Sequence, residues 1–112
     1  MYDAKKRVGL GVEYLDRTNP DWAMQSELDG EISVGNEQSC VLARLGQTKY
    51  RTARNLRNLT NEEAAELGFY ARNSKQPDGS LTLHEYAALS IEWMRRRDER
   101  RAQVERLEQY AA

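Results

Sequence analysis

The amino-acid sequence predicts an all-α protein, a small single-domain bundle of four or five helices that ends in a long charged helix. Three observations support this fold class. Apolar residues recur at the three- and four-residue spacing of helices, capping residues precede several of these stretches, and no glycine or proline follows residue 79. The 112 residues suffice for one domain with one core. We expect that core to include Trp22, Leu42, Leu45, Leu56, Phe69, Leu89 and Trp93.

The first predicted helix covers residues from about 4 to 15, because apolar residues share one of its faces: Ala4, Val8, Val12 and Leu15. The alternation over residues 8–14 would also suit a strand. Asn19 and Pro20 then predict the cap and the first residue of a short second helix. Further along, we expect Ile32 and Val34 to cover the core in an extended segment.

Polar cap residues divide the middle of the chain into three further helical stretches. Ser39 precedes an apolar stretch that Gly46 ends, and Thr48 precedes a stretch whose apolar face holds Tyr50, Ala53 and Leu56. Thr60 and Glu63 have the spacing of a capping box, in which each side chain bonds to the backbone of the other residue.

The last predicted helix runs from about residue 83 to 109, with Thr82 as its cap and Glu85 completing a second capping box. It would be about 40 Å long, whereas a compact domain of this size is about 34 Å across. We therefore expect a helical core domain, residues 1–94, and a charged extension of the last helix, residues 95–112, which is not a separate domain. The buried first half is expected to include Tyr86, Leu89, Ile91, Trp93 and Met94.

Composition and charge argue against several classes of protein. The net charge of −1 and the pI near 5.9 disfavour a general attraction to nucleic acids or anionic membranes. No apolar run approaches the roughly 20 residues that span a bilayer, and residues 1–14 lack the pattern of a secretory signal. The single cysteine, Cys40, excludes an internal disulfide and fits a reducing compartment. We expect a cytoplasmic protein with no membrane partner.

Residues 74–86, SKQPDGSLTLHEY, partly match a calcium-binding loop. Gly79 would take the sharp-turn position and Glu85 the final bidentate position. Ser74 and Gln76 occupy the first and third positions, where carboxylates are needed. Too little negative charge remains to offset dehydration of the ion, so the stretch favours a turn that precedes a helix. We predict no metal site and no cofactor.

Cys40 and His84 are the one thiol and the one imidazole of the chain. Structural zinc needs a cluster of such ligands, and a cysteine beside two apolar residues is typically buried, although spacing alone leaves a Cys–His pair open. His84 is expected at the surface. No phosphate loop, nucleophile elbow or paired-carboxylate motif is present. We therefore expect neither enzyme activity nor a small-molecule substrate.

The basic side chains are concentrated in the middle of the chain, because residues 41–57 hold five of them and no acidic one. With the capped stretch that follows, they would form a helix-turn-helix whose nucleic-acid-binding residues are Arg44, Lys49, Arg51, Arg54 and Arg57. Alternatively, they form a solvated face or pair with the acidic segments on either side. The next helix carries Glu62, Glu63 and Glu66, which disfavours its insertion into a DNA groove.

The C-terminal stretch RRRDERRAQVERLEQY is a second candidate binding surface. The pairs Arg95–Glu99 and Arg101–Glu105 have helical spacing and would each contribute roughly a few tenths of a kcal/mol. The stretch is either a solvated helix end or an exposed arm for self-association or for docking on a protein partner. In the second case the partner-binding residues are Arg96, Arg97, Arg100, Arg101, Val104, Leu107 and Tyr110.

The stretches GVEYLDRTNPDWAMQSELD, SCVLARLG and EEAAELGF resemble a family of small, uncharacterised proteins of actinobacteria and their phages. The resemblance covers roughly residues 9–69, rests mostly on core and cap residue types, and implies no catalytic residue. It implies a phage or prophage accessory protein acting in a bacterial host cell. Our leading hypothesis is a non-enzymatic protein-interaction module that binds a host protein or itself. The alternative is a small DNA- or RNA-binding regulator that uses residues 44–57.

Overall fold

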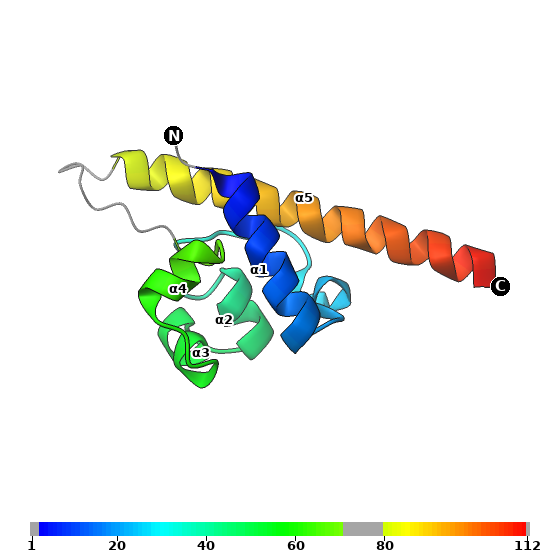
Figure 1. Cartoon of the computed structure of the whole chain (residues 1–112), viewed down its shortest axis with the longest axis horizontal. Coiled ribbons are helices and arrows are strands. Elements are labelled where there is room, and N and C mark those ends of the chain that lie inside the picture. The colour runs from blue at the N-terminus through cyan, green and yellow to red at the C-terminus, as the bar shows by residue number, and fades with distance from the viewer. Residues whose placement is uncertain (1–2, 71–79, 112) are drawn as a thin grey trace.

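The structure is a computed structural model that describes residues 3–70 and 80–111, without the side chains of residues 80–83 and 111. All regular structure in these two ranges is helical, which confirms the predicted all-α fold with a long C-terminal helix (Figure 1). Two 3-10 turns, η1 (Trp22–Met24) and η2 (Ser26–Leu28), follow the first helix. The α-helices are α1 (Ala4–Thr18), α2 (Val41–Gly46), α3 (Tyr50–Leu56), α4 (Asn61–Glu66) and α5 (Ser80–Ala111).

The long helix α5 lies along one side of the molecule, α1 crosses it, and the short helices α2, α3 and α4 lie together on the same side of α5 (Figure 1). The core is built around three buried aromatic rings. Trp22 meets Trp93 edge to face with their ring centroids 5.7 Å apart, and Phe69 stacks on Trp93 at 5.2 Å. Trp93 Nε1 donates a hydrogen bond of 2.7 Å to the carbonyl of Gly68, so its one polar atom is satisfied inside the core.

The predicted first helix is confirmed together with its buried face. Asp3 caps α1 by accepting a hydrogen bond of 2.9 Å from the backbone N–H of Lys6. Val8, Val12 and Leu15 are buried on one face, as the spacing predicted. Gly11 belongs to the same face, and its missing side chain is what lets α1 and α5 approach closely.

The expected helix at Asn19 and Pro20 is replaced by the two 3-10 turns η1 and η2. The backbone N–H of Asn19 bonds to the carbonyl of Leu15, so Asn19 closes α1 instead of capping a new helix. Burial of Trp22 and Leu28 stabilises the short turns, and no side-chain cap is found at either turn. Ile32 and Val34, further along, are buried as expected.

The middle helices follow the predicted order with small shifts at their starts. Cys40 precedes α2 and Lys49 precedes α3, each one residue later than the predicted caps Ser39 and Thr48. The capping box of Thr60 and Glu63 is confirmed at the start of α4. Among the predicted core residues, the assignment of Leu56 is wrong, because it lies at the end of the short helix α3 and is 74% exposed. Leu45 is partly buried, and the other five are buried.

Helix α5 begins at Ser80, so the predicted cap Thr82 falls inside the helix. The turn predicted over residues 74–79, and with it the calcium-loop comparison, lies outside the described residues. Leu89 and Trp93 are buried as expected, whereas Ile91 is 64% exposed because it lies on the opposite face of the helix. No helix in the described part of the chain is both long enough and apolar enough to cross a membrane.

Candidate functional site

The contacts between α5 and the rest of the chain continue seven residues past Met94, to Arg101. Arg97, which is only 8% exposed, donates hydrogen bonds to the carbonyl oxygens of Leu28, at 2.7 Å, and Gly30. Arg97 was predicted to bind a partner. Instead, it donates the hydrogen bonds that satisfy two backbone carbonyls, one at the last residue of η2 and one just after it.

Arg100 also binds within the chain. Its two terminal nitrogens donate to the two carboxylate oxygens of Asp16 at 2.8 and 3.0 Å, and its guanidinium lies 5.9 Å from the ring of Trp22. Trp22 Nε1 donates to the same carboxylate at 3.0 Å. The hydrogen bond from Arg100 lowers the pKa of Asp16 below the ordinary aspartate value, and the bond from Trp22 lowers it further, against the effect of partial burial.

Arg101 completes the attachment of α5. It donates to the carbonyl oxygens of Ala23, at 2.6 Å, and Gln25, at 3.1 Å, and forms an ion pair of 2.7 Å with Asp29. This ion pair takes the place of the predicted pair with Glu105, while the predicted pair of Arg95 with Glu99 is formed. The projecting part of α5 therefore starts at Ala102 rather than at Arg95.

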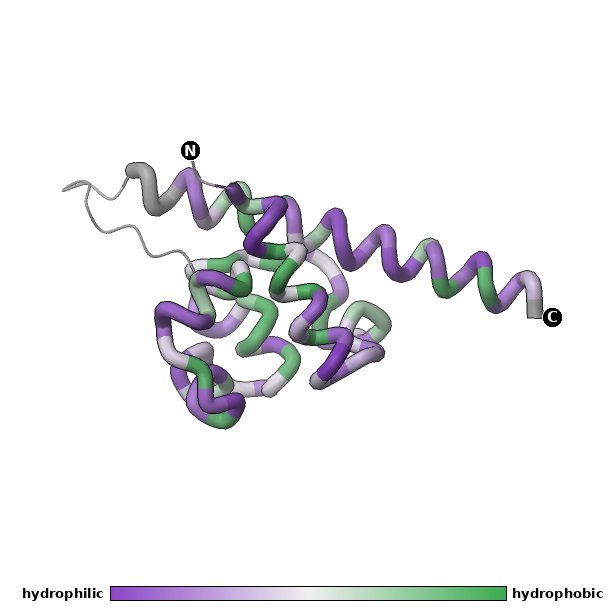
Figure 2. Tube along the Cα trace, in the orientation of Figure 1, coloured by the Kyte–Doolittle hydropathy of each residue, from purple (hydrophilic) through white to green (hydrophobic). Residues whose placement is uncertain are grey.

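We call residues 102–111 the α5 arm. The molecule measures 55 × 29 × 22 Å along its principal axes, and the arm forms one end of the longest dimension (Figure 1). Figure 2 shows that the second half of α5 is mostly hydrophilic, with separate hydrophobic positions. Leu107 is 69% exposed and Tyr110 is 94% exposed, whereas Val104 is half-buried. Arg96, the remaining predicted partner-binding residue, precedes the arm and pairs with Glu92 at 3.1 Å.

Three of the five predicted nucleic-acid-binding residues hydrogen-bond within the chain. Arg44 donates to the carbonyl of Asp29, and Arg54 to the carbonyl of Leu59. Arg57 donates to the hydroxyls of Tyr14 and Thr18, and its guanidinium lies 5.6 Å from the Tyr14 ring. Lys49 and Arg51 are exposed. The five side chains thus do not form one open basic face, and binding of DNA or RNA by this segment stays a prediction.

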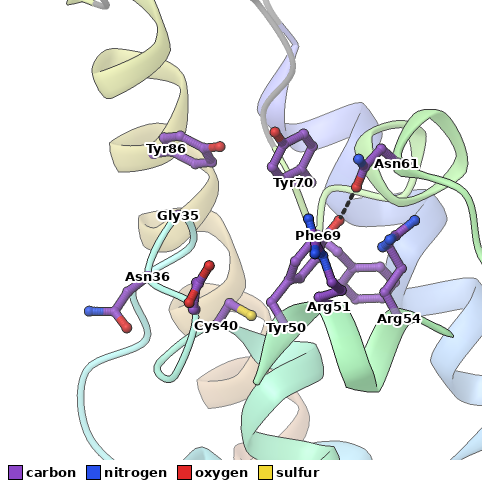
Figure 3. A pocket seen from close by; sticks show the side chains of 11 residues that line it. Gly35, Asn36, Cys40, Tyr50, Arg51, Arg54, Asn61, Phe69, Tyr70 and Tyr86 are labelled. Carbon is purple, nitrogen blue, oxygen red and sulfur yellow. Dashed lines mark hydrogen bonds between the residues drawn. The ribbon is translucent and has the colours of Figure 1, made fainter. Parts of the chain in front are cut away.

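A pocket of about 260 Å³ lies beside α3, and we call it the tyrosine pocket (Figure 3). Its walls come from the segment 35–40, from α3, from residues 61–70 and from α5. Tyr50 and Tyr70 stack with their ring centroids 5.4 Å apart, and Tyr86 meets Tyr70 edge to face at 6.2 Å. No sequence pattern pointed to this pocket, because its three tyrosines are spread over three separate parts of the chain.

Burial governs the two titratable groups in the wall of this pocket. The hydroxyl of Tyr50 donates a hydrogen bond of 3.1 Å to Asn61 Oδ1 (Figure 3), and desolvation raises the pKa of Tyr50 above its ordinary value, so it stays neutral. Cys40 is only 2% exposed, as expected, and burial raises the pKa of its thiol. His84 is exposed at the start of α5, also as expected.

In the described residues, no three side chains of His, Cys, Asp or Glu come together in an arrangement that would hold a metal ion. Comparison with protein-family models, with curated proteins and with solved structures found no match.

Proposed function

We propose that this protein is a non-enzymatic interaction module that self-associates through the α5 arm. The supporting observation is the exposure of Leu107 and Tyr110 on a helix that has left the globule after Arg101. Single exposed apolar residues are common on protein surfaces. Here, however, Val104, Leu107 and Tyr110 follow one another at three-residue spacing along one side of the helix. Such a stripe gains free energy when another helix covers it.

The spacing of the apolar residues of the arm suits a second copy of the same chain as the occupant. Val104 and Leu107 have the spacing of the a and d positions of a heptad. In an antiparallel pair, Val104 of one copy would pack against Leu107 of the other, in both directions about a twofold axis. Arg101 stays bonded to the carbonyls of Ala23 and Gln25 and to Asp29, so it takes no part in this contact.

The size of the arm predicts a weak complex. Ten helical residues extend about 15 Å, and two such segments bury less surface than the roughly 1,200 Å² typical of stable interfaces. We therefore expect a reversible dimer with a dissociation constant of about 10 µM to 1 mM.

The experiment compares two matched leucine variants by sedimentation velocity over a series of protein concentrations up to about 1 mM. Leu107→Glu places a charge in the proposed interface and should keep the chain monomeric. Leu56→Glu makes the same change at an equally exposed leucine on α3, 74% against 69% exposed, and should dimerise like the unaltered chain. Circular dichroism should show equal helix content in all three.

Each other outcome contradicts the proposal. If the unaltered chain stays monomeric throughout the series, self-association is excluded, and the arm would then be expected to bind a different protein. A dimer that Leu107→Glu leaves unchanged, or that Leu56→Glu disrupts equally, shows that another surface is used.

A phage or prophage origin and a location in the bacterial cytoplasm are part of the proposal, and they are supported only by the resemblance of the stretches within residues 9–69. Fractionation of the native host cell, followed by detection of the untagged chain, tests the location. Recovery in the membrane fraction would contradict it.

A further inference from the structure

The tyrosine pocket carries a separate inference, independent of the α5 arm. Its aromatic wall is held in place before any ligand arrives. The Tyr86 ring packs directly on Gly35, where a Cβ atom would lie 2.8 Å from the ring. Tyr70 is fixed between Tyr50, on which it stacks, and Tyr86, which it meets edge to face. Figure 3 shows Tyr50, Tyr70 and Tyr86 around the pocket, which Phe69 also lines. Such a wall suits a planar ring.

Two arginines of α3 give the pocket its positive charge. Arg51 and Arg54 both line it, together with the single acid Glu37. Arg54 is held by one hydrogen bond of 3.2 Å from Nη1 to the carbonyl of Leu59, and its guanidinium lies 5.9 Å from the ring of Tyr50. Its Nε is buried and has no hydrogen-bond partner among the described residues.

The charge and size of the pocket restrict the ligand. Two guanidinium groups against one carboxylate leave a single net positive charge in the wall, which matches a monoanion better than a doubly charged phosphate ester. The volume of about 260 Å³ lies just below the range of about 300–1,000 Å³ typical of ligand pockets. It accommodates one aromatic ring with a short polar group. Arginine binds carboxylates through directed pairs of hydrogen bonds.

We propose that the tyrosine pocket binds a small aromatic carboxylate. Its ring would lie against Tyr70 and Tyr86, and its carboxylate would accept hydrogen bonds from Arg51 and Arg54. The neutral hydroxyl of Tyr50, already bound to Asn61, is part of the rigid wall.

The first test titrates the full-length chain with three probes: benzoate, benzamide and acetate. Chemical shifts in two-dimensional ¹H–¹⁵N spectra report binding. Benzoate should produce saturable shifts at residues 35–40 and 50–54 with a dissociation constant of about 1 mM or tighter. Benzamide lacks the charge and acetate lacks the ring, so each should bind at least about tenfold more weakly. Equal affinity for benzoate and acetate, or no saturable shift, would overturn the proposal. Tighter binding of phenyl phosphate would overturn the preference for a monoanion.

The second test uses matched arginine variants. Arg51→Gln removes an exposed guanidinium from the pocket and should weaken benzoate binding at least about fivefold, leaving the weak benzamide affinity unchanged. Arg44→Gln makes the same change of charge outside the pocket, where Arg44 bonds to the carbonyl of Asp29, and should bind benzoate normally. Equal losses in both variants would show a general charge effect and contradict the site. Arg51 is exposed and outside the core, so the comparison does not depend on a variant that fails to fold.

Discussion

The carboxylate of Asp16 is the point at which side chains of α1, η1 and α5 meet. It accepts two hydrogen bonds from Arg100 and one from Trp22. Its side chain is 39% exposed, so the ion pair with Arg100 is screened by solvent and contributes about 1 kcal/mol or less. The bond to Trp22 differs, because the indole is fully buried and has no access to water. Loss of that acceptor costs about 1–3 kcal/mol.

We expect Asp16→Asn and Asp16→Ala to separate these two contributions. Asparagine keeps an acceptor for Trp22 and loses only the charge, which should lower the free energy of unfolding by about 0.5–1 kcal/mol at pH 7. The folded-state pKa of Asp16 is lowered, so the contribution of the charge is present above the unfolded-state pKa and is lost as the pH falls through the folded-state pKa. The effect of Asp16→Asn should therefore vanish in acid, whereas the additional cost of Asp16→Ala should persist.

Urea unfolding followed by tryptophan fluorescence at pH 7 and at about pH 2 measures both effects. Arg95→Gln is the control, because Arg95 pairs only with residues of its own helix in the described structure. An effect of Asp16→Asn that is equal at both pH values would show that the carboxylate charge does not contribute.

The sequence could not distinguish the internal role of Arg97 and Arg101 from a role in partner binding. Most of their acceptors are backbone carbonyls of residues 23–30, which no side-chain pattern reveals. The sequence showed only a run of arginines on a long helix. Leu107 and Tyr110, by contrast, are exposed as predicted, because they lie beyond the last contact of α5 with the globule.

At the scale of elements, the crossing of α1 over α5 depends on Gly11. A Cβ atom there would overlap the carbonyl oxygen of Leu67 and would lie 2.7 Å from the Trp93 ring. Both neighbours are fixed parts of the core, so α1 would have to move away from α5. Gly9 lies two residues earlier in α1. A Cβ atom there would meet only the end of the Arg96 side chain, at 3.3 Å, and that side chain can move aside.

We therefore expect opposite results from the same substitution at these two glycines. Gly11→Ala should lower the free energy of unfolding by about 3 kcal/mol, the upper part of the range for overpacked cores. Gly9→Ala should be neutral or should raise it by up to about 1 kcal/mol, because alanine favours the helix. Chemical denaturation of the three chains gives both values. Equal effects at the two positions would show that helix propensity, rather than the α1–α5 contact, decides the outcome.

Elements with a strong local signal could be predicted, whereas elements that depend on tertiary burial could not. The capping box at Thr60 and the apolar face of α1 are local features, and both are confirmed. The turns η1 and η2 depend on the burial of Trp22 and Leu28 against other segments, so the Asn–Pro signal at residues 19–20 was misleading. The tyrosine pocket likewise required the packing of distant segments before its residues could be recognised.

At the scale of the whole molecule, α5 is both a core element and a projecting helix. The radius of gyration, 14.3 Å, exceeds the value of about 13 Å for a compact domain of this size. As predicted, α5 is too long to fit within the globule. The part of α5 that is attached to the globule, however, extends further along the helix than expected. Arg97, Arg100 and Arg101 bind residues 16–30 and belong to the globule.

Two truncated chains test where the globule ends. A chain of residues 1–102 keeps all three arginines and removes only residues beyond the last hydrogen bond between α5 and the globule in the described structure. Its free energy of unfolding should therefore stay within about 0.5 kcal/mol of the full chain. A chain of residues 1–97 loses the bonds of Arg100 and Arg101, including charged hydrogen bonds to the carbonyls of Ala23 and Gln25, and should be less stable by about 2–4 kcal/mol. Urea unfolding measures both. If both chains were as stable as the full chain, the globule would end before Arg100, and the arm available to a second copy would be longer than residues 102–111.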